Sequence, residues 1–292
     1  MRRAGGASGA SGQPTLEEVR AFWDSNPLFT GESQHRPGTP EFFEEHERTV
    51  ISEHSGMIAP IFTRDVRPGA AVLDVGCGIG FWVGLFSRLG ANVSACDLTE
   101  RGVQMTRRRL ELAGHHADVR QGNAESLPYG QESFDHVNCQ GVIHHTPDPS
   151  ACVREFHRVL RKNGTLCLSV YYKTAALRSE LFFKAATLLS RPFLRMRGRG
   201  RENMLAAASP EELVRLYDGA ANPLGVAFTR AKFRALLAGR FEVIEQWRLG
   251  FPRRAFPLSM PDSVHRMLGN ILGLMIVFRC RKVDTERRSE VR

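Results

Sequence analysis

Short apolar runs alternate with amphipathic segments through the middle of the chain. Five runs have the length of a buried strand and end near glycine or a polar turn: 71–75, 91–96, 118–121, 134–139 and 165–170. Three intervening segments carry apolar residues at helical spacing: 82–89, 101–112 and 149–160. Strands that alternate with helices in this way predict a parallel sheet with helices on both faces.

Two helices are expected before the first strand, and both begin with a capping signal. Thr15 precedes a helix with acidic residues in its first turn, and Thr39 precedes a helix whose first residue is Pro40. Because these helices precede the sheet, we expect them to form a lid.

The alternation stops after Tyr172. Helices are expected over 175–194, from 209 and over 229–237, and strands over 241–247 and 273–280. We therefore divide the chain into a disordered Gly/Ala/Ser-rich tail (1–14), a helical lid (15–63), a core (64–172), a helical substrate cap (173–235), C-terminal strands that complete the sheet (236–283) and a tail (284–292).

A glycine loop follows the first predicted strand. Asp74 leads into Gly76, Gly78 and Gly80, where glycine lets the chain turn sharply and lets a ligand approach closely. A dinucleotide-binding loop has the spacing GxGxxG, whereas this loop is GxGxG and continues with Phe81. Asp74 suits an ammonium better than a pyrophosphate, so the loop favours a cofactor with an amino-acid end and no phosphates.

Two more polar signals follow the next two strands. Asp97 lies 21 positions after Gly76 (97 − 76), where a carboxylate can accept both hydroxyls of a ribose. Asn123, in Gly122-Asn123-Ala124-Glu125, can accept from an adenine amino group. Because all three signals stand at the carboxyl ends of predicted strands, they indicate one nucleoside site.

With these motifs the chain resembles the class I S-adenosylmethionine-dependent methyltransferases, in the small-molecule group that includes quinone-pathway enzymes. The matching motifs are VLDVGCGIG (72–80), ACDLT (95–99), GNAESLP (122–128), FDHVNCQGVIHHTPDP (134–149) and LRKNGTL (160–166). The resemblance implies an α/β fold with a doubly wound, seven-stranded, mostly parallel Rossmann-like sheet whose last strand is antiparallel. It also implies S-adenosylmethionine as the cofactor.

The resemblance assigns parts of the cofactor to residues. Asp74 and the glycines would face the methionine portion, Asp97 the ribose, Asn123 and Ala124 the adenine, and Gln140 the sulfonium end. The expected cofactor-binding residues are Asp74, Gly76, Cys77, Gly78, Gly80, Asp97, Leu98, Asn123, Ala124, Glu125 and Gln140. Many relatives carry Asp in place of Asn123, whose amide accepts a hydrogen bond without charge assistance.

The acceptor side is less defined. His145 and His144 are candidate general bases, which a phenol or alcohol needs and a carboxylate or free amine does not. A structural or packing role for both histidines is the alternative. Trp23, Tyr171 and Tyr172 are candidates to line the acceptor pocket, with lid or core packing as the alternative.

Composition narrows the partners. The 292 residues are 42% hydrophobic and carry a formal charge of +9, mostly from arginine. Five arginines and no acid lie in the segment 191–201, which predicts a solvated loop, with anionic-substrate or membrane-surface contact as the alternative; it lacks the aromatics of single-strand nucleic-acid binders apart from Phe193. We expect the apolar residues of the preceding helix to roof a pocket or pack on the sheet rather than enter lipid; they are Leu181, Phe182, Phe183, Leu188 and Leu189.

The six cysteines form no CxxC pair and no metal-site spacing, so we expect reduced core residues and no metal. The longest apolar stretch, 267–278, is shorter than the ~20 residues that span a bilayer, and the N-terminus lacks a secretory pattern. We therefore expect a cytoplasmic monomer or homodimer without a membrane span.

Together these features predict an enzyme that methylates a small, fairly apolar molecule, with oxygen favoured over nitrogen as the nucleophile. The arginine-rich, lysine-poor composition is typical of GC-rich bacterial genomes and is associated with natural product biosynthesis. A non-catalytic S-adenosylmethionine-binding scaffold is one alternative. An RNA methyltransferase is another, although Asn138-Cys139-Gln140-Gly141 lacks the Asn/Asp-Pro-Pro-aromatic tetrad of exocyclic-amine methylases.

Overall fold

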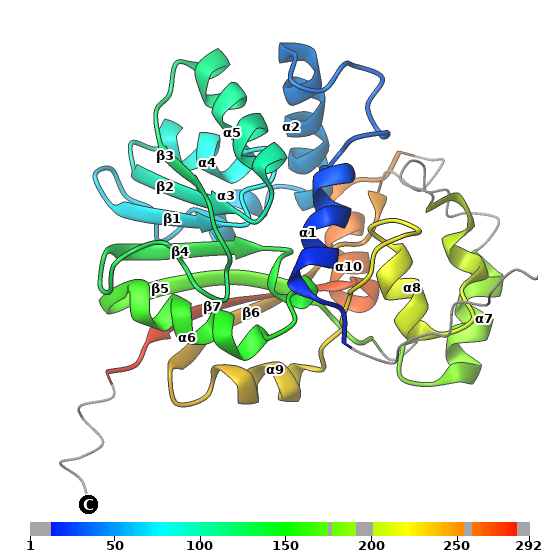
Figure 1. Ribbon diagram of the computed structural model, residues 1–292. Coiled ribbons are helices and arrows are strands. Elements are labelled where there is room, and N and C mark those ends of the chain that lie inside the picture. The colour runs from blue at the N-terminus through cyan, green and yellow to red at the C-terminus, as the bar shows by residue number, and fades with distance from the viewer. Residues whose placement is uncertain (1–12, 175–176, 191–200, 254–258, 285–292) are drawn as a thin grey trace, which may run out of the picture.

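The computed structural model describes residues 13–174, 177–190, 201–253 and 259–284, which form a seven-stranded sheet between helices (Figure 1). The strands are β1 (Ala71–Val75), β2 (Asn92–Asp97), β3 (Asp118–Gln121), β4 (Phe134–Gln140), β5 (Leu160–Tyr171), β6 (Phe241–Leu249) and β7 (Met275–Lys282). Their order is β3-β2-β1-β4-β5-β7-β6, and β7 runs antiparallel to both of its neighbours. The predicted fold class and the antiparallel last strand are confirmed.

Helices cover both faces of the sheet (Figure 1). One face carries α2 (Pro40–His54), α3 (Ile58–Phe62), α4 (Phe81–Arg88) and α5 (Glu100–Ala113), and the other carries α6 (Pro149–Val159) and α9 (Arg230–Leu237). Alternate residues of β1 supply the two cores, because successive side chains of a strand point to opposite faces. Val72 packs with Val83 and Phe86 of α4, whereas Leu73 belongs to the cluster with α6 and α9.

The N-cap residues predicted for the two helices of the lid are confirmed. Thr15 begins α1 (Leu16–Ser25) with a capping box, and the Thr39 hydroxyl accepts from the Phe42 amide at the start of α2. Two short helices, α3 and α10 (Asp262–Leu272), were not predicted. The apolar stretch 267–278 is divided between α10 and β7. Gly273 lies between the two elements. This position requires glycine, because a Cβ there would lie 2.2 Å from the Leu249 carbonyl oxygen.

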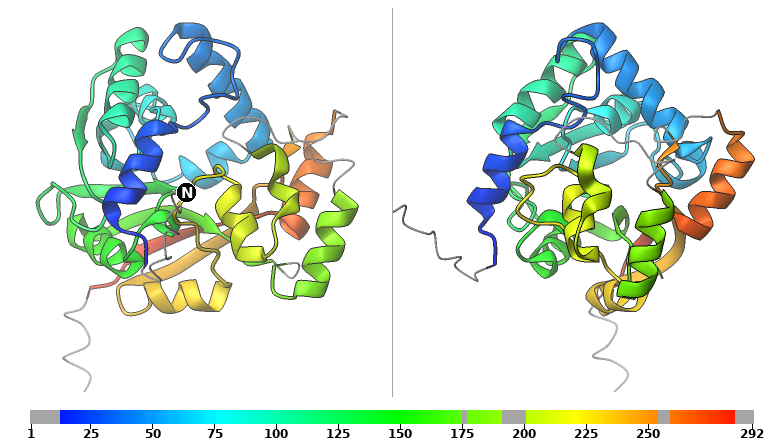
Figure 2. Two further views of the ribbon diagram at one scale, coloured as in Figure 1. Left: turned by 45° about the vertical axis from the view of Figure 1, so that its right-hand side comes forward. Right: turned by 90° about the vertical axis from the view of Figure 1, so that its right-hand side faces the viewer.

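The predicted cap contains α7 (Glu180–Ser190), the 3₁₀ helix η2 (Arg201–Ala206) and α8 (Pro210–Leu216), which lie together on one side of the molecule (Figure 2). The predicted boundary at 235 falls within α9, whose Phe233 and Leu237 are buried in the sheet core. The sequence 230–235 therefore packs with the sheet rather than with the cap.

The expectation that the apolar residues of α7 roof a pocket or pack on the sheet is confirmed for Phe183 and wrong for the leucines. Leu181, Leu188 and Leu189 are 78%, 64% and 72% exposed. The helix is anchored instead by Phe183, which packs with Leu177 and Tyr171. No helix among the described residues is long and apolar enough to cross a membrane.

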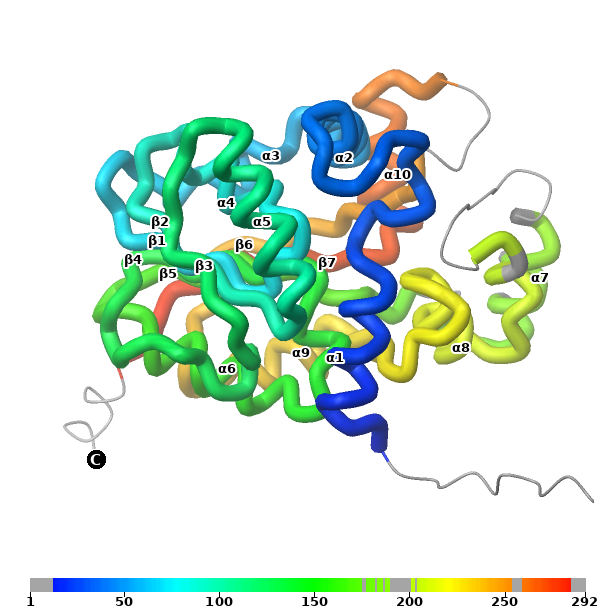
Figure 3. The backbone as a smooth tube through the Cα atoms, turned by 45° about the horizontal axis from the view of Figure 1, so that its top comes forward, coloured from blue at the N-terminus to red at the C-terminus, as the bar shows by residue number. Residues whose placement is uncertain are grey.

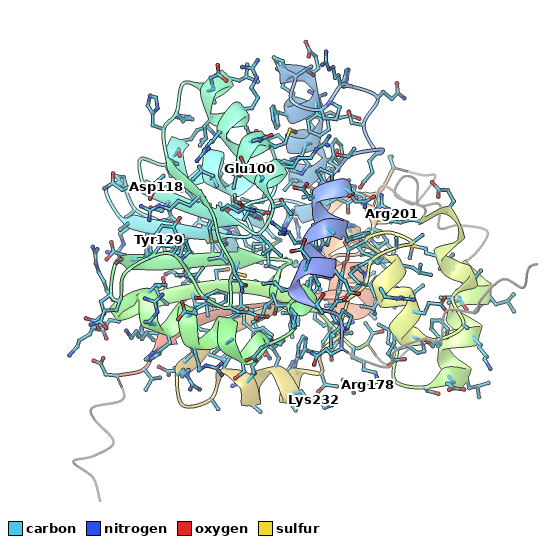
Figure 4. The ribbon with its side chains drawn as sticks, viewed as in Figure 1. Glu100, Asp118, Tyr129, Arg178, Arg201 and Lys232 are labelled. Atoms are coloured by element: carbon cyan, nitrogen blue, oxygen red, sulfur yellow. The ribbon has the colours of Figure 1, made fainter. Side chains whose placement is uncertain are left out.

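Arg201 departs from the expected solvated loop. Its side chain is 1% exposed, and it forms an ion pair at 2.9 Å with Glu32, which lies in the lid between α1 and α2. Arg201 is labelled in Figure 4, on the cap side of the molecule. The ion pair therefore joins the cap to the lid. The other four arginines of this segment, and the predicted tails up to residue 12 and from residue 285, lie outside the described residues.

All six cysteines are buried and free, as expected of core residues. Two of them lie outside the strands: Cys77 is in the glycine loop and Cys152 is on α6.

Candidate functional site

A cavity of about 410 Å³ lies where the carboxyl ends of the parallel strands meet the lid and the cap. Figure 3 shows α1 between the sheet and α8. We call the residues contributed by the glycine loop and by the ends of β2, β3 and β4 the sheet half of the cavity; they include Gly76, Gly78, Asp97, Leu98, Asn123, Ala124 and Gln140. The remaining residues form the lid–cap half; they include Leu16, Val19, Trp23, Leu28, His144, His145, Tyr171, Tyr217, Asp218 and Met275.

The glycine loop adopts backbone angles that other residues rarely adopt. Gly76, Gly78 and Gly80 have φ values of 71°, 55° and 79°. A Cβ on Gly76 would lie 2.2 Å from Cγ2 of Val142, whereas a Cβ on Gly78 would meet no protein atom within 4 Å. Gly76 therefore has to be glycine for packing, and Gly78 faces open space in the cavity.

Asp97 holds the loop while lining the cavity. Its Oδ2 accepts the Gly78 amide proton at 2.8 Å, and its Oδ1 accepts from the Thr99 amide and hydroxyl at 2.9 and 2.7 Å. Burial raises the pKa of the Asp97 carboxyl, and the hydrogen bonds from Thr99 and Gly78 oppose that rise. The carboxylate is thus fixed in orientation by the backbone that surrounds it.

Asp74 is buried behind the loop and is only half satisfied. Its Oδ1 accepts from the Asn138 side-chain amide at 2.6 Å, while its Oδ2 has no hydrogen-bond partner among the described residues. Burial, with a smaller contribution from the nearby Asp97 charge, raises the pKa of Asp74 from its ordinary 3.8 to about 7. A buried carboxylate in this state gains from a nearby cation.

A chain of amides connects Asp74 to the cavity. Gln140 donates to the Asn138 side-chain oxygen at 2.8 Å and to the Cys167 carbonyl at 3.0 Å, and Gln140 lines the cavity. The orientation of both amides follows from these bonds, because each nitrogen must face an acceptor.

The loop after β3 supplies the next wall. The Asn123 side-chain oxygen accepts from the Glu125 amide at 2.9 Å, so it closes its own turn. Leu98, Asn123 and Ala124 line the cavity. Four predicted cofactor-binding residues are not among the lining residues: Asp74, Cys77, Gly80 and Glu125.

Both ring nitrogens of His145 are engaged in the lid–cap half. Nδ1 lies 2.5 Å from the Leu224 carbonyl oxygen, and Nε2 lies 3.1 Å from Oδ2 of Asp218. The same Asp218 oxygen accepts a short hydrogen bond from the Tyr171 hydroxyl. The edge of Trp23 approaches the His145 ring, with centroids 5.1 Å apart. His145, Asp218 and Tyr171 thus form one buried polar cluster at the cavity wall.

His144 also lines the cavity, but it is placed as an acceptor. Its Nδ1 accepts the Tyr171 amide proton at 3.3 Å. Burial and the neighbouring His145 hold the pKa of His144 well below its ordinary value. A neutral ring with one nitrogen already bonded is a weak candidate for taking a proton from an acceptor.

Tyr172 is not brought to this cavity. It lines a much smaller pocket beside Tyr171, and the Arg248 guanidinium lies over its ring at 4.7 Å. Trp23 and Tyr171, in contrast, both line the main cavity.

Several residues of the lid–cap half were not predicted from the sequence. Leu16, Val19 and Trp23 lie three and four positions apart on α1, so their helical spacing could have revealed one apolar face. Asp218 and Tyr217 follow α8 in no motif, and no sequence signal marks them. Among the described residues, no cluster of three or more histidine, cysteine or acidic side chains could hold a metal ion.

Comparisons with known proteins agree with the geometry of the sheet half. Residues 73–168 match the family model described as a methyltransferase domain. The ubiquinone biosynthesis O-methyltransferase of Xanthomonas campestris pv. campestris is 33% identical over 188 residues, which cover 63% of this chain and 77% of that protein.

Two solved structures share the fold at low sequence identity. The [4+2]-cyclase SpnF superposes with a TM-score of 0.58 at 16% identity, covering 94% of this chain and 99% of that one. A putative methyltransferase from Bacillus halodurans gives a TM-score of 0.52 at 22% identity, covering 78% of this chain and 99% of that one. At these identities the two structures support the fold alone.

Proposed function

Because the chain belongs to the class I S-adenosylmethionine-dependent methyltransferases, we propose that it methylates a small, largely apolar acceptor, with oxygen favoured over nitrogen as the nucleophile. Most side chains of the lid–cap half are apolar or aromatic, and this is the observation that carries the proposal. Relatives named ubiquinone biosynthesis O-methyltransferase support the choice of oxygen.

Three features of the sheet half suit the cofactor. Gly78 borders space that a Cβ would enter freely, Asp97 presents a fixed carboxylate to the cavity, and Asp74 has a buried oxygen without a hydrogen-bond partner. We propose that Asp97 accepts the ribose hydroxyls and that Asp74 lies toward the ammonium group. Leu98, Asn123 and Ala124 would border the adenine.

When bound, S-adenosylmethionine supplies a methyl group already activated by the sulfonium. The residues of this chain then have two tasks, to align the acceptor and to exclude water. Leu16, Val19 and Trp23 of α1 close the cavity from the lid, and Tyr217 and Asp218 close it from the cap. Proximity and exclusion of water would supply most of the rate.

The proposal includes a biological setting. The chain carries 40 Lys+Arg, of which five are lysines, a composition typical of GC-rich bacterial genomes. We therefore propose a role in bacterial specialised metabolism rather than in a nucleic-acid pathway.

The direct test supplies purified protein with methyl-labelled S-adenosylmethionine and a panel of small phenols, alcohols and amines. We expect S-adenosylhomocysteine and an equal amount of label in an organic-extractable product. Saturable binding of the donor without product would favour the scaffold alternative. Label in added RNA, with binding that weakens steeply as salt rises, would favour the RNA methyltransferase.

A further inference from the structure

The lid–cap half of the cavity carries one carboxylate, Asp218, and this residue follows α8 in the cap. Asp97 and Asp218 are the two acidic residues among the described lining residues, and no arginine or lysine lines the cavity with them. A carboxylate acceptor would therefore lose its hydration there without an arginine or lysine to pair with. The lining therefore favours a neutral acceptor over a carboxylate.

The hydrogen bonds of His145 fix how many protons the cluster holds. The Leu224 carbonyl oxygen requires an N–H at Nδ1, so a neutral His145 ring would have a bare Nε2. Nε2 faces the Asp218 carboxylate, and two such acceptors need a proton between them. His145 and Asp218 therefore share one proton and form a neutral pair. Neither nitrogen of His145 is then available to an acceptor.

Asp218 presents its carboxylate to the cavity, and a carboxylate can accept more than the two hydrogen bonds that His145 and Tyr171 make to it. A carboxylate offers about four lone-pair sites. The Tyr171 hydroxyl and His145 Nε2 both approach the same oxygen, Oδ2. These two donors fix the orientation of the Asp218 carboxylate. The residue is 7% exposed and lines the cavity.

The surrounding chain holds Asp218 at this place. The Asn222 side chain accepts from the Leu224 amide at 3.2 Å and donates to the Arg215 carbonyl at 3.1 Å, which closes the loop after α8. Val226 donates from its amide to the His144 carbonyl at 3.0 Å. The loop after α8 is thus docked on η1 (Ile143–His145) by its own backbone.

We propose that Asp218 is the specificity-determining residue of the acceptor site and accepts a hydrogen bond from the nucleophilic group. The acceptor is then a neutral molecule whose nucleophilic atom carries a hydrogen, a hydroxyl or an amine, and not a carboxylate. His145 and Tyr171 are positioning residues that act through Asp218. The inference rests on the proposed methyl transfer, because it concerns the second substrate of the same cavity.

The test measures binding rather than turnover. The protein is saturated with S-adenosylhomocysteine and titrated by calorimetry with para-propylphenol and para-propylbenzoate, which share an apolar tail and differ in the polar group. We expect the phenol to bind at least about tenfold more tightly, since a hydrogen bond to a charged group contributes roughly 1.5–3 kcal/mol. Asp218→Asn should remove most of that preference, while Tyr171→Phe should reduce it by a smaller factor.

Control measurements separate the possible failures. Asp118→Asn, an exposed acid on β3, should keep the phenol preference of the native protein. Unchanged S-adenosylhomocysteine affinity and melting temperature would show that Asp218→Asn is folded. If that variant does not fold, para-propylanisole decides with the native protein, because it lacks the hydroxyl hydrogen and should bind about tenfold more weakly than the phenol.

Several results overturn the inference. They are native protein that binds the phenol no better than the benzoate, including binding of neither; a phenol preference that survives in folded Asp218→Asn; and an anisole that binds as well as the phenol. Native protein that binds no S-adenosylhomocysteine would instead contradict the proposed function, so the two failures are distinguishable.

Discussion

The two halves of the cavity are built in different ways. The sheet half comes from strand ends and the loops directly after them, and its polar groups are fixed by nearby backbone, as Asp97 is by Gly78 and Thr99. The lid–cap half joins α1, η1, the end of β5 and the loop after α8. Its cluster of His145, Asp218 and Tyr171 joins segments up to 73 positions apart in the chain (218 − 145).

This difference indicates where the specificity for the acceptor can change. Parallel strands bring the sheet half together whenever the sheet forms, because their carboxyl ends share one edge. The lid–cap half depends on how the lid and the cap dock, so it can vary while the donor site is kept.

Gly76→Ala should have the largest combined effect, because it lowers both the stability of the fold and the affinity for the donor. The new Cβ would overlap Val142, and φ of 71° is strained for alanine. We expect a loss of roughly 2–5 kcal/mol in the free energy of unfolding, from backbone strain and overpacking. Denaturant unfolding measures it.

Gly78→Ala is the matched control for the glycine loop. Its Cβ meets no protein atom within 4 Å, so only backbone strain of about 1–2 kcal/mol is expected. Gly78→Ala should lower the affinity for the donor more than it lowers the free energy of unfolding. Equal losses of stability in the two variants would contradict the packing role assigned to Gly76.

Arg201→Met should be the most damaging change to the docking of the cap on the lid. It removes the cation of a buried ion pair, and the loss of one member of such a pair typically costs about 3–5 kcal/mol. The double variant with Glu32→Leu should recover much of this loss. Arg20→Ala, which removes an exposed ion pair within α1, should cause no measurable change in melting temperature.

Asp74 should make donor binding depend on pH. Its pKa of about 7 leaves the carboxyl largely protonated at pH ~6, and a nearby ammonium would lower that pKa. Donor binding near pH ~6 should therefore release up to about one proton, and the release should fade at pH ~8. Calorimetry in two buffers of different ionisation enthalpy measures this release.

Asp74→Asn is the control, and it should abolish the proton release. The raised pKa also predicts that the free energy of unfolding of native protein falls as pH rises from about 4 to about 7, because the folded state keeps a proton that the unfolded state has lost. Proton release that persists in the variant would assign the effect to another group.

Leu189→Ser on α7 should have the smallest effect. The side chain is 72% exposed, so we expect a change within about 0.5 kcal/mol in stability and none in acceptor binding. Phe183→Ser, at a 2% exposed position on the same helix, should destabilise the protein strongly. A large effect of Leu189→Ser on acceptor binding would instead indicate that α7 contributes to the wall of the cavity.

The strands and most helices were predictable because their signals are local. Glycines after an apolar run, the capping residues Thr15 and Thr39, and polar residues at strand ends all act within a few positions. Helix α10 was not predicted, although the strand that follows it was. Its second half falls in the apolar stretch 267–278, which continues into β7, and its residues Val264, Met267 and Ile271 are exposed rather than part of the core.

The sheet half was predictable for the same reason, and the lid–cap half was not. Asp97 and Gln140 have fixed places relative to strands, and both line the cavity. Asp218 follows a helix whose docking depends on tertiary contacts, among them the buried Arg201–Glu32 pair. The local sequence pattern carries no information about such docking. The sequence could therefore indicate His145 as a candidate base, but it could not reveal that Leu224 and Asp218 engage both of its ring nitrogens.

Calorimetric titration with S-adenosylmethionine tests the central claim most directly, that the carboxyl edge of the sheet is a donor site organised by Asp97. Native protein and Asp118→Asn should bind the donor at one site with equal affinity. Asp97→Asn should stay folded and bind at least about tenfold more weakly, because its hydrogen bonds to the ribose lose their charge. No binding by native protein, or unchanged affinity in Asp97→Asn, would contradict the account.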